Sequence, residues 1–316
     1  GLWLESERML HPVVSQKGID TQNEVVKEEK RLSENQPYGK LLEVVVENLF
    51  KVHPYKGTVI GKMEHLDNAS EEDYKKFNKK FHVPNNAVLV VAGDIDYNET
   101  IDLVKKYFDD IPRGEDVERN FPVEDPITES ERVKAYDENI QIPAYVLAYR
   151  TPAQNERDSW VLNMISTYLS DGESSKLYKK IVDEKKMALT IQAISLAQED
   201  YGVYIVFNLP QGEKSFDEMN REIDEEIIKI QENLISERDF EKIQNKLESQ
   251  FVNSNSSFEG IASSLATYYM LYDDINLINN QIEIYKSITR EEIREVARKY
   301  LNANQRIEIE YLPKKK

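Results

Sequence analysis

The spacing of hydrophobic and polar residues divides the chain into helical and extended stretches. Apolar residues spaced three and four apart predict helices over 2–9, 19–32, 41–50, 70–81, 98–108, 158–169, 174–186, 215–233, 236–251 and 258–270. Continuous or alternating apolar runs predict strands over 87–92, 144–149, 188–197, 201–209 and 306–312. Strands and helices come in blocks, not in strict alternation. The pattern therefore predicts an α+β fold, with a mixed or antiparallel sheet layered against helices.

One helix–turn–strand pattern occurs twice, 219 residues apart and without a gap. Each copy opens with a hydroxyl residue that has an acid three positions later: Ser70 with Asp73, and Thr289 with Glu292. This arrangement satisfies the free N–H groups of a helix start and is typical of a capping box. The apolar stripe of the helix and one face of the strand also match: Tyr74, Phe77, Phe81, Val88 and Val90 correspond to Ile293, Val296, Tyr300, Ile307 and Ile309. The repeat predicts two similar α+β domains.

The repeat also predicts how the domains divide the chain. The second copy starts near residue 125, so the first copy would start about ninety residues before Gly1. We therefore expect residues 1–115 to form the C-terminal portion of an incomplete first domain. Residues 116–126, rich in charge and turn formers, would be a linker. Residues 127–316 would form the complete second domain.

Composition narrows the possible partners. The 316 residues include 58 acidic and 41 basic side chains, a formal net charge of −17. Such a surface repels phosphate backbones and anionic membranes, so we expect no nucleic-acid partner. The longest apolar run, Val88–Ala92, is too short to span a bilayer. The absence of cysteine excludes disulfides, thiolate metal sites and cysteine nucleophiles.

Common catalytic motifs are missing from the sequence. It contains no phosphate-binding loop, no dinucleotide glycine fingerprint and no Gly-x-Ser-x-Gly elbow. Neither His-Glu-x-x-His nor the inverted His-x-x-Glu-His occurs. His11 and His53 each precede a proline, which favours extended or turn backbone. We interpret each as a surface or turn residue, not as a ligand.

Glu29 is the one unusual acid. With the helix over 19–32 wound at about 100° per residue, Glu29 and Gln22 fall within about 60° of Val25, on the face that valines would bury. A buried carboxylate needs a metal, a cation or several donors, because desolvation without a partner costs several kcal/mol. The alternative is an exposed helix on which valines happen to lie near acids. Spacing alone leaves both interpretations open.

Seven segments, in order and covering nearly the whole chain, resemble the pitrilysin/insulinase-type zinc peptidases, the inverted-motif zincins. They include the run His53-Pro-Tyr-Lys-Gly and the pair Gly93-Asp94, which follows the apolar run Val88–Ala92. The segments are Leu2–Met9, Asn23–Glu29, His53–Gly61, Val83–Asp94, Ile142–Arg150, Asp171–Tyr178 and Asp183–Leu189. The resemblance agrees with the repeat, because that family builds each half from two similar α+β domains.

The resemblance implies a zinc site of which this chain holds one ligand. In that family two histidines of His-x-x-Glu-His and a later glutamate bind zinc, and the motif glutamate is the general base. Glu29 falls at the third ligand. Gln22 falls where members often carry a second acid beside the site, so its role in tuning the metal is in doubt. The histidine motif is absent here, so the resemblance implies no catalytic residue within the chain and no zinc held by it alone.

The resemblance further implies a peptide substrate and a partner. Active single-chain members carry an Arg and a Tyr where this sequence has Val182 and Leu189, which cannot hydrogen-bond an oxyanion. In some bacterial relatives a companion subunit supplies that pair. The implied parent is thus the metal-bearing part of a two-part peptidase, completed by a companion subunit, a second half or a second copy. The alternative is a non-catalytic structural or peptide-binding homologue.

Overall fold

The structure is a computed structural model that describes residues 1–314. Its α-helices are α1 Leu2–Leu10, α2 Gln16–Asn35, α3 Leu41–Leu49, α4 Met63–Asn68, α5 Glu71–Phe81, α6 Tyr97–Phe108, α7 Arg157–Ser170, α8 Phe216–Glu232, α9 Glu237–Ser254, α10 Phe258–Tyr272, α11 Leu277–Ser287 and α12 Arg290–Tyr300. Short 3-10 helices span Pro54–Lys56 and Pro84–Asn86, and a π-helix spans Tyr178–Glu184. The strands are β1 Glu131–Asp137, β2 Ala144–Thr151, β3 Ala188–Leu196, β4 Gly202–Pro210 and β5 Arg306–Pro313.

The chain divides into two compact units. Unit 1 comprises Gly1–Ser33, Val59–Phe121 and Ser254–Ile278. Unit 2 comprises Glu34–Thr58, Pro122–Asn253 and Asn279–Lys316. The units do not follow the predicted domain boundaries in sequence, because residues 34–58 belong to the unit that contains the sheet. The division at 1–115, 116–126 and 127–316 stays a prediction.

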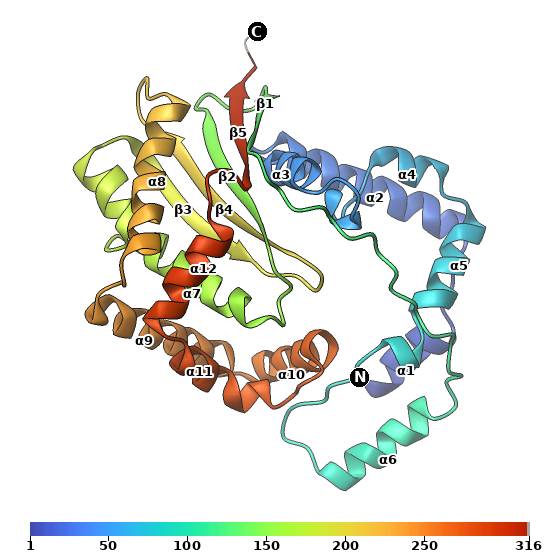
Figure 1. Ribbon diagram of the computed structural model, residues 1–316. Helices are drawn as coiled ribbons and strands as arrows, with labels where there is room; N and C mark the ends of the chain where they lie inside the picture. Colours follow the sequence, from blue (N-terminus) through green and yellow to red (C-terminus); the bar gives the residue numbers. More distant parts are fainter. Residues whose placement is uncertain (315–316) are drawn as a thin grey trace. The chain divides into compact units, whose positions relative to one another are not determined.

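Unit 2 is built on a five-stranded mixed sheet in the order β1-β5-β2-β4-β3 (Figure 1). β1 pairs with β5 in parallel, and the other neighbours are antiparallel. The predicted α+β class, with strands layered against helices, is confirmed. Sequence patterning missed β1, because only its Val133 and Ala135 pack against apolar neighbours and neither is fully buried.

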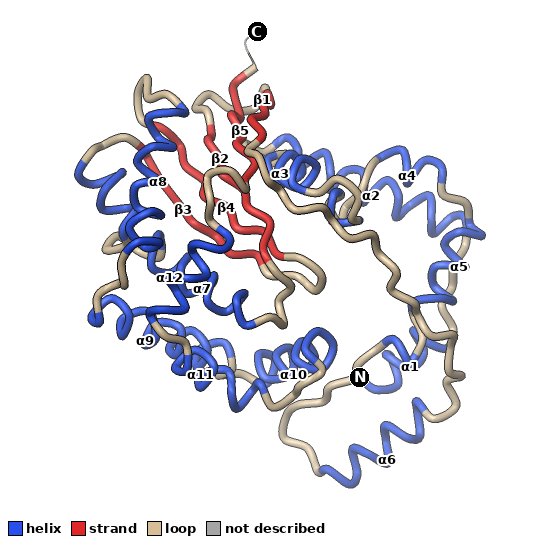
Figure 2. The backbone as a smooth tube through the Cα atoms, in the orientation of Figure 1, coloured by secondary structure: helices blue, strands red, loops and turns tan. Residues whose placement is uncertain are grey.

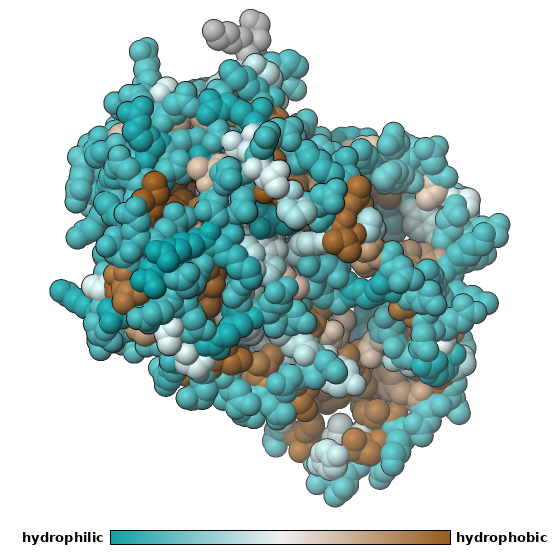
Figure 3. Space-filling model, viewed as in Figure 1, coloured by the Kyte–Doolittle hydropathy of each residue, from teal (hydrophilic) through white to brown (hydrophobic). Residues whose placement is uncertain are grey.

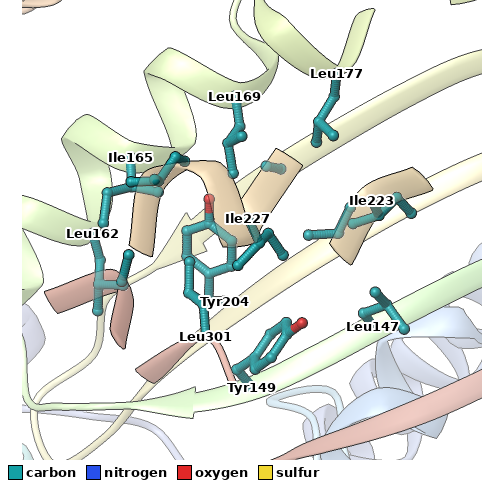
Figure 4. Packing of buried hydrophobic residues seen from close by; sticks show 14 of the residues in the cluster. Leu147, Tyr149, Leu162, Ile165, Leu169, Leu177, Tyr204, Ile223, Ile227 and Leu301 are labelled. Carbon is teal, nitrogen blue, oxygen red and sulfur yellow. The ribbon is translucent and has the colours of Figure 1, made fainter. Parts of the chain in front are cut away.

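Helices α7, α8 and α12 cover one face of this sheet (Figure 1). The strands contribute Leu147, Tyr149 and Tyr204 to the core between the layers, and the helices contribute buried leucines and isoleucines (Figure 4). Burying one such aliphatic side chain stabilises the fold by roughly 1.5–3 kcal/mol. This core fixes the sheet as a rigid platform for the segments attached to its edges and ends.

Helix α3 covers part of the opposite face, where Val45, Leu49 and Phe50 are buried against the alternate residues of β2 and β5. Successive side chains of a strand point to opposite faces of the sheet. β2 and β5 therefore contribute residues to the core under α3 and to the core under α7, α8 and α12. Residues 50–58, which follow α3 in the sequence, belong to unit 2 as well.

Unit 1 contains helices and loops, and all strands described for residues 1–314 belong to the sheet of unit 2 (Figure 2). Both predicted capping boxes are present: Ser70 and Asp73 cap α5, and Thr289 and Glu292 cap α12. The predicted strand over 87–92 is wrong as a ladder strand. No backbone hydrogen bond joins residues 87–92 to another described residue. A strand needs a neighbour to pair with, and within residues 1–314 this one has none.

Candidate functional site

Glu29 and Gln22 lie on α2 in unit 1, and both side chains are exposed. Val25, the reference of their shared face, is 54% exposed. The expectation that this face buries Glu29 is wrong for this structure. Winding a helix shows which side chains share a face, but burial depends on what packs against that face. The alternative interpretation, an exposed helix face, describes the geometry.

The opposite face of α2 is the one that packs. The Asn23 amide donates to the Leu66 carbonyl oxygen at 3.0 Å and accepts from the Tyr74 hydroxyl at 2.5 Å. Lys27 pairs with Asp67 of α4 at 2.6 Å. Its hydrogen bonds, first to Asp67 and then to a neighbouring acid on α2, raise the pKa of Lys27. These contacts attach α2 to α4 and α5 and leave Glu29 on the other side of the helix.

The described residues do not make a metal site by themselves. Within residues 1–314, no three His, Asp or Glu side chains are placed to hold one ion. The Glu29 side chain has no hydrogen bond or ion pair to any residue in that range. The donor set therefore does not fit zinc: one carboxylate is present, where a zinc site needs three protein ligands or more.

The two second-half positions are apolar in the structure as well. Val182 lies in the π-helix and packs against the core of unit 2, and Leu189 lies on the edge strand β3, 49% exposed. The predicted helix over 174–186 is present in part as this wider π-helix. Burial alone would lower the pKa of Lys180, but hydrogen bonds to Glu225 and neighbouring acids of α8 raise it. Here the segment serves to pack onto α8.

His53 forms the turn expected from its proline but is not on the surface. It caps the 3-10 helix, with its Nδ1 accepting from the Tyr55 N–H at 3.2 Å. Only 2% of the residue is exposed, and its Nε2 lies 3.5 Å from a carboxylate oxygen of Asp200. His11, by contrast, is exposed in the segment after α1, as expected.

Sequence reasoning missed the acid beside His53. Glu124 is 7% exposed, and one of its oxygens accepts three backbone N–H groups, from residues 51, 52 and 53. The other oxygen pairs with Arg150 of β2 at 2.7 Å. The sequence signals were two prolines, Pro122 and Pro126, each two positions from Glu124, and the His-Pro turn at His53. Nothing in their spacing brings the two together across the 71 positions that separate them.

The family of the chain follows from comparison with known proteins. Residues 68–247 match the family described as "Peptidase M16 inactive domain". The chain belongs to this M16 peptidase family, and the resemblance to the inverted-motif zinc peptidases is confirmed.

Curated relatives are named as zinc proteases. The chain is 24% identical over 287 residues to "Zinc protease PqqE" of Helicobacter pylori, covering 90% of this chain and 64% of that protein. It is 24% identical over 190 residues to an uncharacterized zinc protease of Mycobacterium leprae, covering 60% of this chain and 43% of that protein. The chain thus spans less than two thirds of the length of these relatives.

Solved structures show the same fold. A protease from Helicobacter pylori superposes with a TM-score of 0.89 at 23% identity, covering 99% of this chain and 76% of that one. A peptidase M16 inactive domain from Pseudomonas fluorescens gives 0.85 at 13% identity, covering 99% of this chain and 74% of that one. No helix within residues 1–314 has the length and apolarity needed to cross a bilayer. Most of the surface visible in Figure 3 is hydrophilic.

Proposed function

We propose that the chain is part of the metal-bearing subunit of an M16-type zinc peptidase that cleaves peptides or unfolded segments. In this proposal Glu29 contributes one carboxylate to a site whose other ligands, and whose general base, come from polypeptide outside these residues. The supporting observation is the placement of Glu29: exposed, unpaired within residues 1–314, and opposite the face by which α2 packs. Because one carboxylate cannot hold zinc, we expect the chain alone to be inactive.

The positions of Val182 and Leu189 point to a companion subunit. Val182 and Leu189 offer no hydrogen-bond donor to a developing oxyanion, so another chain would have to supply donors at that place. We propose that a companion subunit, the second half of a larger protein or a second copy does so. A parent protein that cleaves peptides with no companion chain would contradict this part while leaving Glu29 as a ligand.

A second candidate is a non-catalytic homologue that binds peptides or supports a partner. The observation that favours it is the family match, which carries the description "inactive domain" and covers residues 68–247, outside α2. Gln22 favours it too, since an uncharged amide stands where family members often carry an acid.

The decisive experiment uses the longest natural polypeptide that contains this chain. Glu29→Gln should lower zinc content and the hydrolysis of a quenched fluorescent peptide by about 100-fold or more. Glu28→Gln is the matched control, because Glu28 is an exposed neighbour that pairs with Arg31 alone among residues 1–314. It should leave both measurements near wild type.

The same assay separates the two candidates. The proposal of a metal-bearing subunit is supported if the polypeptide binds one equivalent of zinc and peptide hydrolysis appears when the companion subunit is added. Peptide binding that persists without zinc and without hydrolysis, in wild type and Glu29→Gln alike, supports the non-catalytic homologue and overturns the enzyme.

A further inference from the structure

Unit 2 contains a buried cradle of hydrogen-bond donors filled by a side chain of the chain itself. The backbone N–H groups of Lys51, Val52 and His53 converge on Oε1 of Glu124 at 2.8, 2.7 and 2.7 Å. Arg150 donates to Oε2 of the same carboxylate at 2.7 Å. Successive N–H groups that point at one centre form an anion-binding concavity, a role normally filled by a bound ligand.

The cradle is built to hold a charged oxygen. The Glu124 side chain is 2% exposed and that of Arg150 is 9% exposed. Burial alone would raise the pKa of Glu124, but the three backbone donors and the charge of Arg150 lower it below its usual value. A carboxylate that accepts several N–H bonds beside an arginine stays ionised even when it is buried. Its charge is balanced by the arginine that it contacts.

The surroundings hold the donors in place. The Arg150 guanidinium lies beside the packed rings of Phe50 and Tyr201, 5.9 and 5.8 Å from their centroids. The Tyr201 hydroxyl accepts the backbone N–H of Glu124 at 3.0 Å, and Arg150 also donates to the backbone carbonyl of Asp125. The donors are therefore fixed by the sheet and by aromatic packing, and their placement does not depend on the Glu124 side chain alone.

Two cavities adjoin the cradle. One of about 430 Å³ is lined by Arg150, Tyr201 and Tyr300, and a second of about 290 Å³ by Leu49, Val52 and Arg150. Glu124 is a lining residue of both, so the cradle has space for a small solute next to it.

We propose that residues 51–53 and Arg150 form a carboxylate-binding site whose resident ligand is Glu124. This site fastens residues 122–126, the part of the predicted 116–126 linker that lies in unit 2, to the sheet of that unit. In this proposal the His-Pro-Tyr turn positions the backbone N–H donors of residues 51–53. The inference is independent of the peptidase proposal, since it involves neither Glu29 nor a metal. Because the arginine supplies the single charge that contacts the ligand, a monocarboxylate is the class of anion that the site matches.

Removing the resident ligand should leave an empty site that a small carboxylate refills. In Glu124→Ala we expect the midpoint of thermal unfolding to fall by about 5–10 °C, because Arg150 and three N–H groups lose their partner. Sodium acetate or formate should raise that midpoint saturably, as a ligand that binds only the folded state does. Sodium chloride at equal ionic strength should not. The matched control is Glu118→Ala, which removes an exposed acid of the same linker and should resemble wild type.

Two further measurements keep the test decisive. Trypsin should cleave after Arg119 about tenfold faster in Glu124→Ala, and acetate should slow that cleavage. Glu124→Gln fills the cradle with an amide, so it should be destabilised yet show no response to acetate. The proposal is overturned if acetate stabilises wild type, Glu118→Ala and Glu124→Ala alike, or if Glu124→Ala unfolds and is cleaved like wild type. If Glu124→Ala folds only with acetate or formate, the proposal stands; if it folds with neither, it is overturned.

Discussion

Arg306 at the start of β5 makes a two-point ion pair with Asp224 of α8, and its side chain is only 4% exposed. Arg306 also donates to Glu308 at 2.7 Å and to the Tyr149 hydroxyl at 3.1 Å. Burial, only partly opposed by Arg306, raises the pKa of Tyr149 to about 12, so its hydroxyl stays protonated. The cluster joins the helix layer to the middle of the sheet through the buried Arg306 and Glu308 and the partly exposed Asp224, whose side chain is 26% exposed.

Breaking this pair should be costly. Asp224→Asn neutralises one of the two carboxylates that pair with the buried Arg306 and leaves Glu308 in place, so we expect the free energy of unfolding to fall by about 1.5–3 kcal/mol. Urea denaturation followed by circular dichroism measures the change. The control is Lys299→Ala, which removes an exposed ion pair with Asp158 and should cost at most about 1 kcal/mol. Equal losses in the two variants would contradict the assignment of a buried pair.

The stability of unit 2 should depend on pH through Glu124. The folded-state pKa of this carboxyl lies below its unfolded value of about 4.3, so the ionised form contributes stability above that pH. That contribution is lost as the pH falls through the folded-state pKa. Asp200 is a second acid near this site, because it lies beside His53, whose backbone N–H is one of the donors to Glu124. The free energy of unfolding of wild type minus that of Glu124→Gln should therefore shrink below about pH 4 and be constant near pH 6–7. A difference independent of pH would mean that the Glu124 charge is not held by the cradle.

Local patterns predicted local structure well. The two capping boxes depend on residues three apart, and both formed at the expected positions. The apolar runs over 188–197 and 201–209 predicted two strands, and β3 and β4 formed there. These features are decided within a few neighbouring residues, so a single sequence contains the information.

Features that depend on distant partners were not predicted. The burial of His53 and Glu124 comes from contacts between segments 71 positions apart, which no spacing rule indicates. The exposure of Glu29 depends on what covers one face of α2. Helical winding alone does not determine this. The strand over 87–92 has the alternation of a strand but no neighbour to pair with among residues 1–314.

Zinc should not bind tightly to the 316-residue chain. Within residues 1–314 no three potential ligands converge, and Glu29 alone offers too few donors for a tetrahedral site. Isothermal titration with zinc should show no stoichiometric site, and Glu29→Gln should give the same trace as wild type. Tight binding at one equivalent that Glu29→Gln does not change would show that the ligand is misassigned.

The backbone of residues 87–92 should behave as a strand without a partner. Val88, Val90 and Ala92 are less exposed than the residues between them, whereas β5, the counterpart of this segment in the repeat, is buried on both faces. In β5, hydrogen bonds to β1 and β2 protect the amides, whereas residues 87–92 have none to any described residue. Amide hydrogen exchange should therefore be fast at 88–91 and slow at 307–310 in one sample. Val90→Pro removes an N–H that has no partner, so it should change stability by less than about 0.5 kcal/mol, while Ile309→Pro in β5 should cost about 3 kcal/mol or more. Slow exchange at 88–91 in a dilute sample would contradict an unpaired strand, and slow exchange only at high concentration would indicate pairing between two copies.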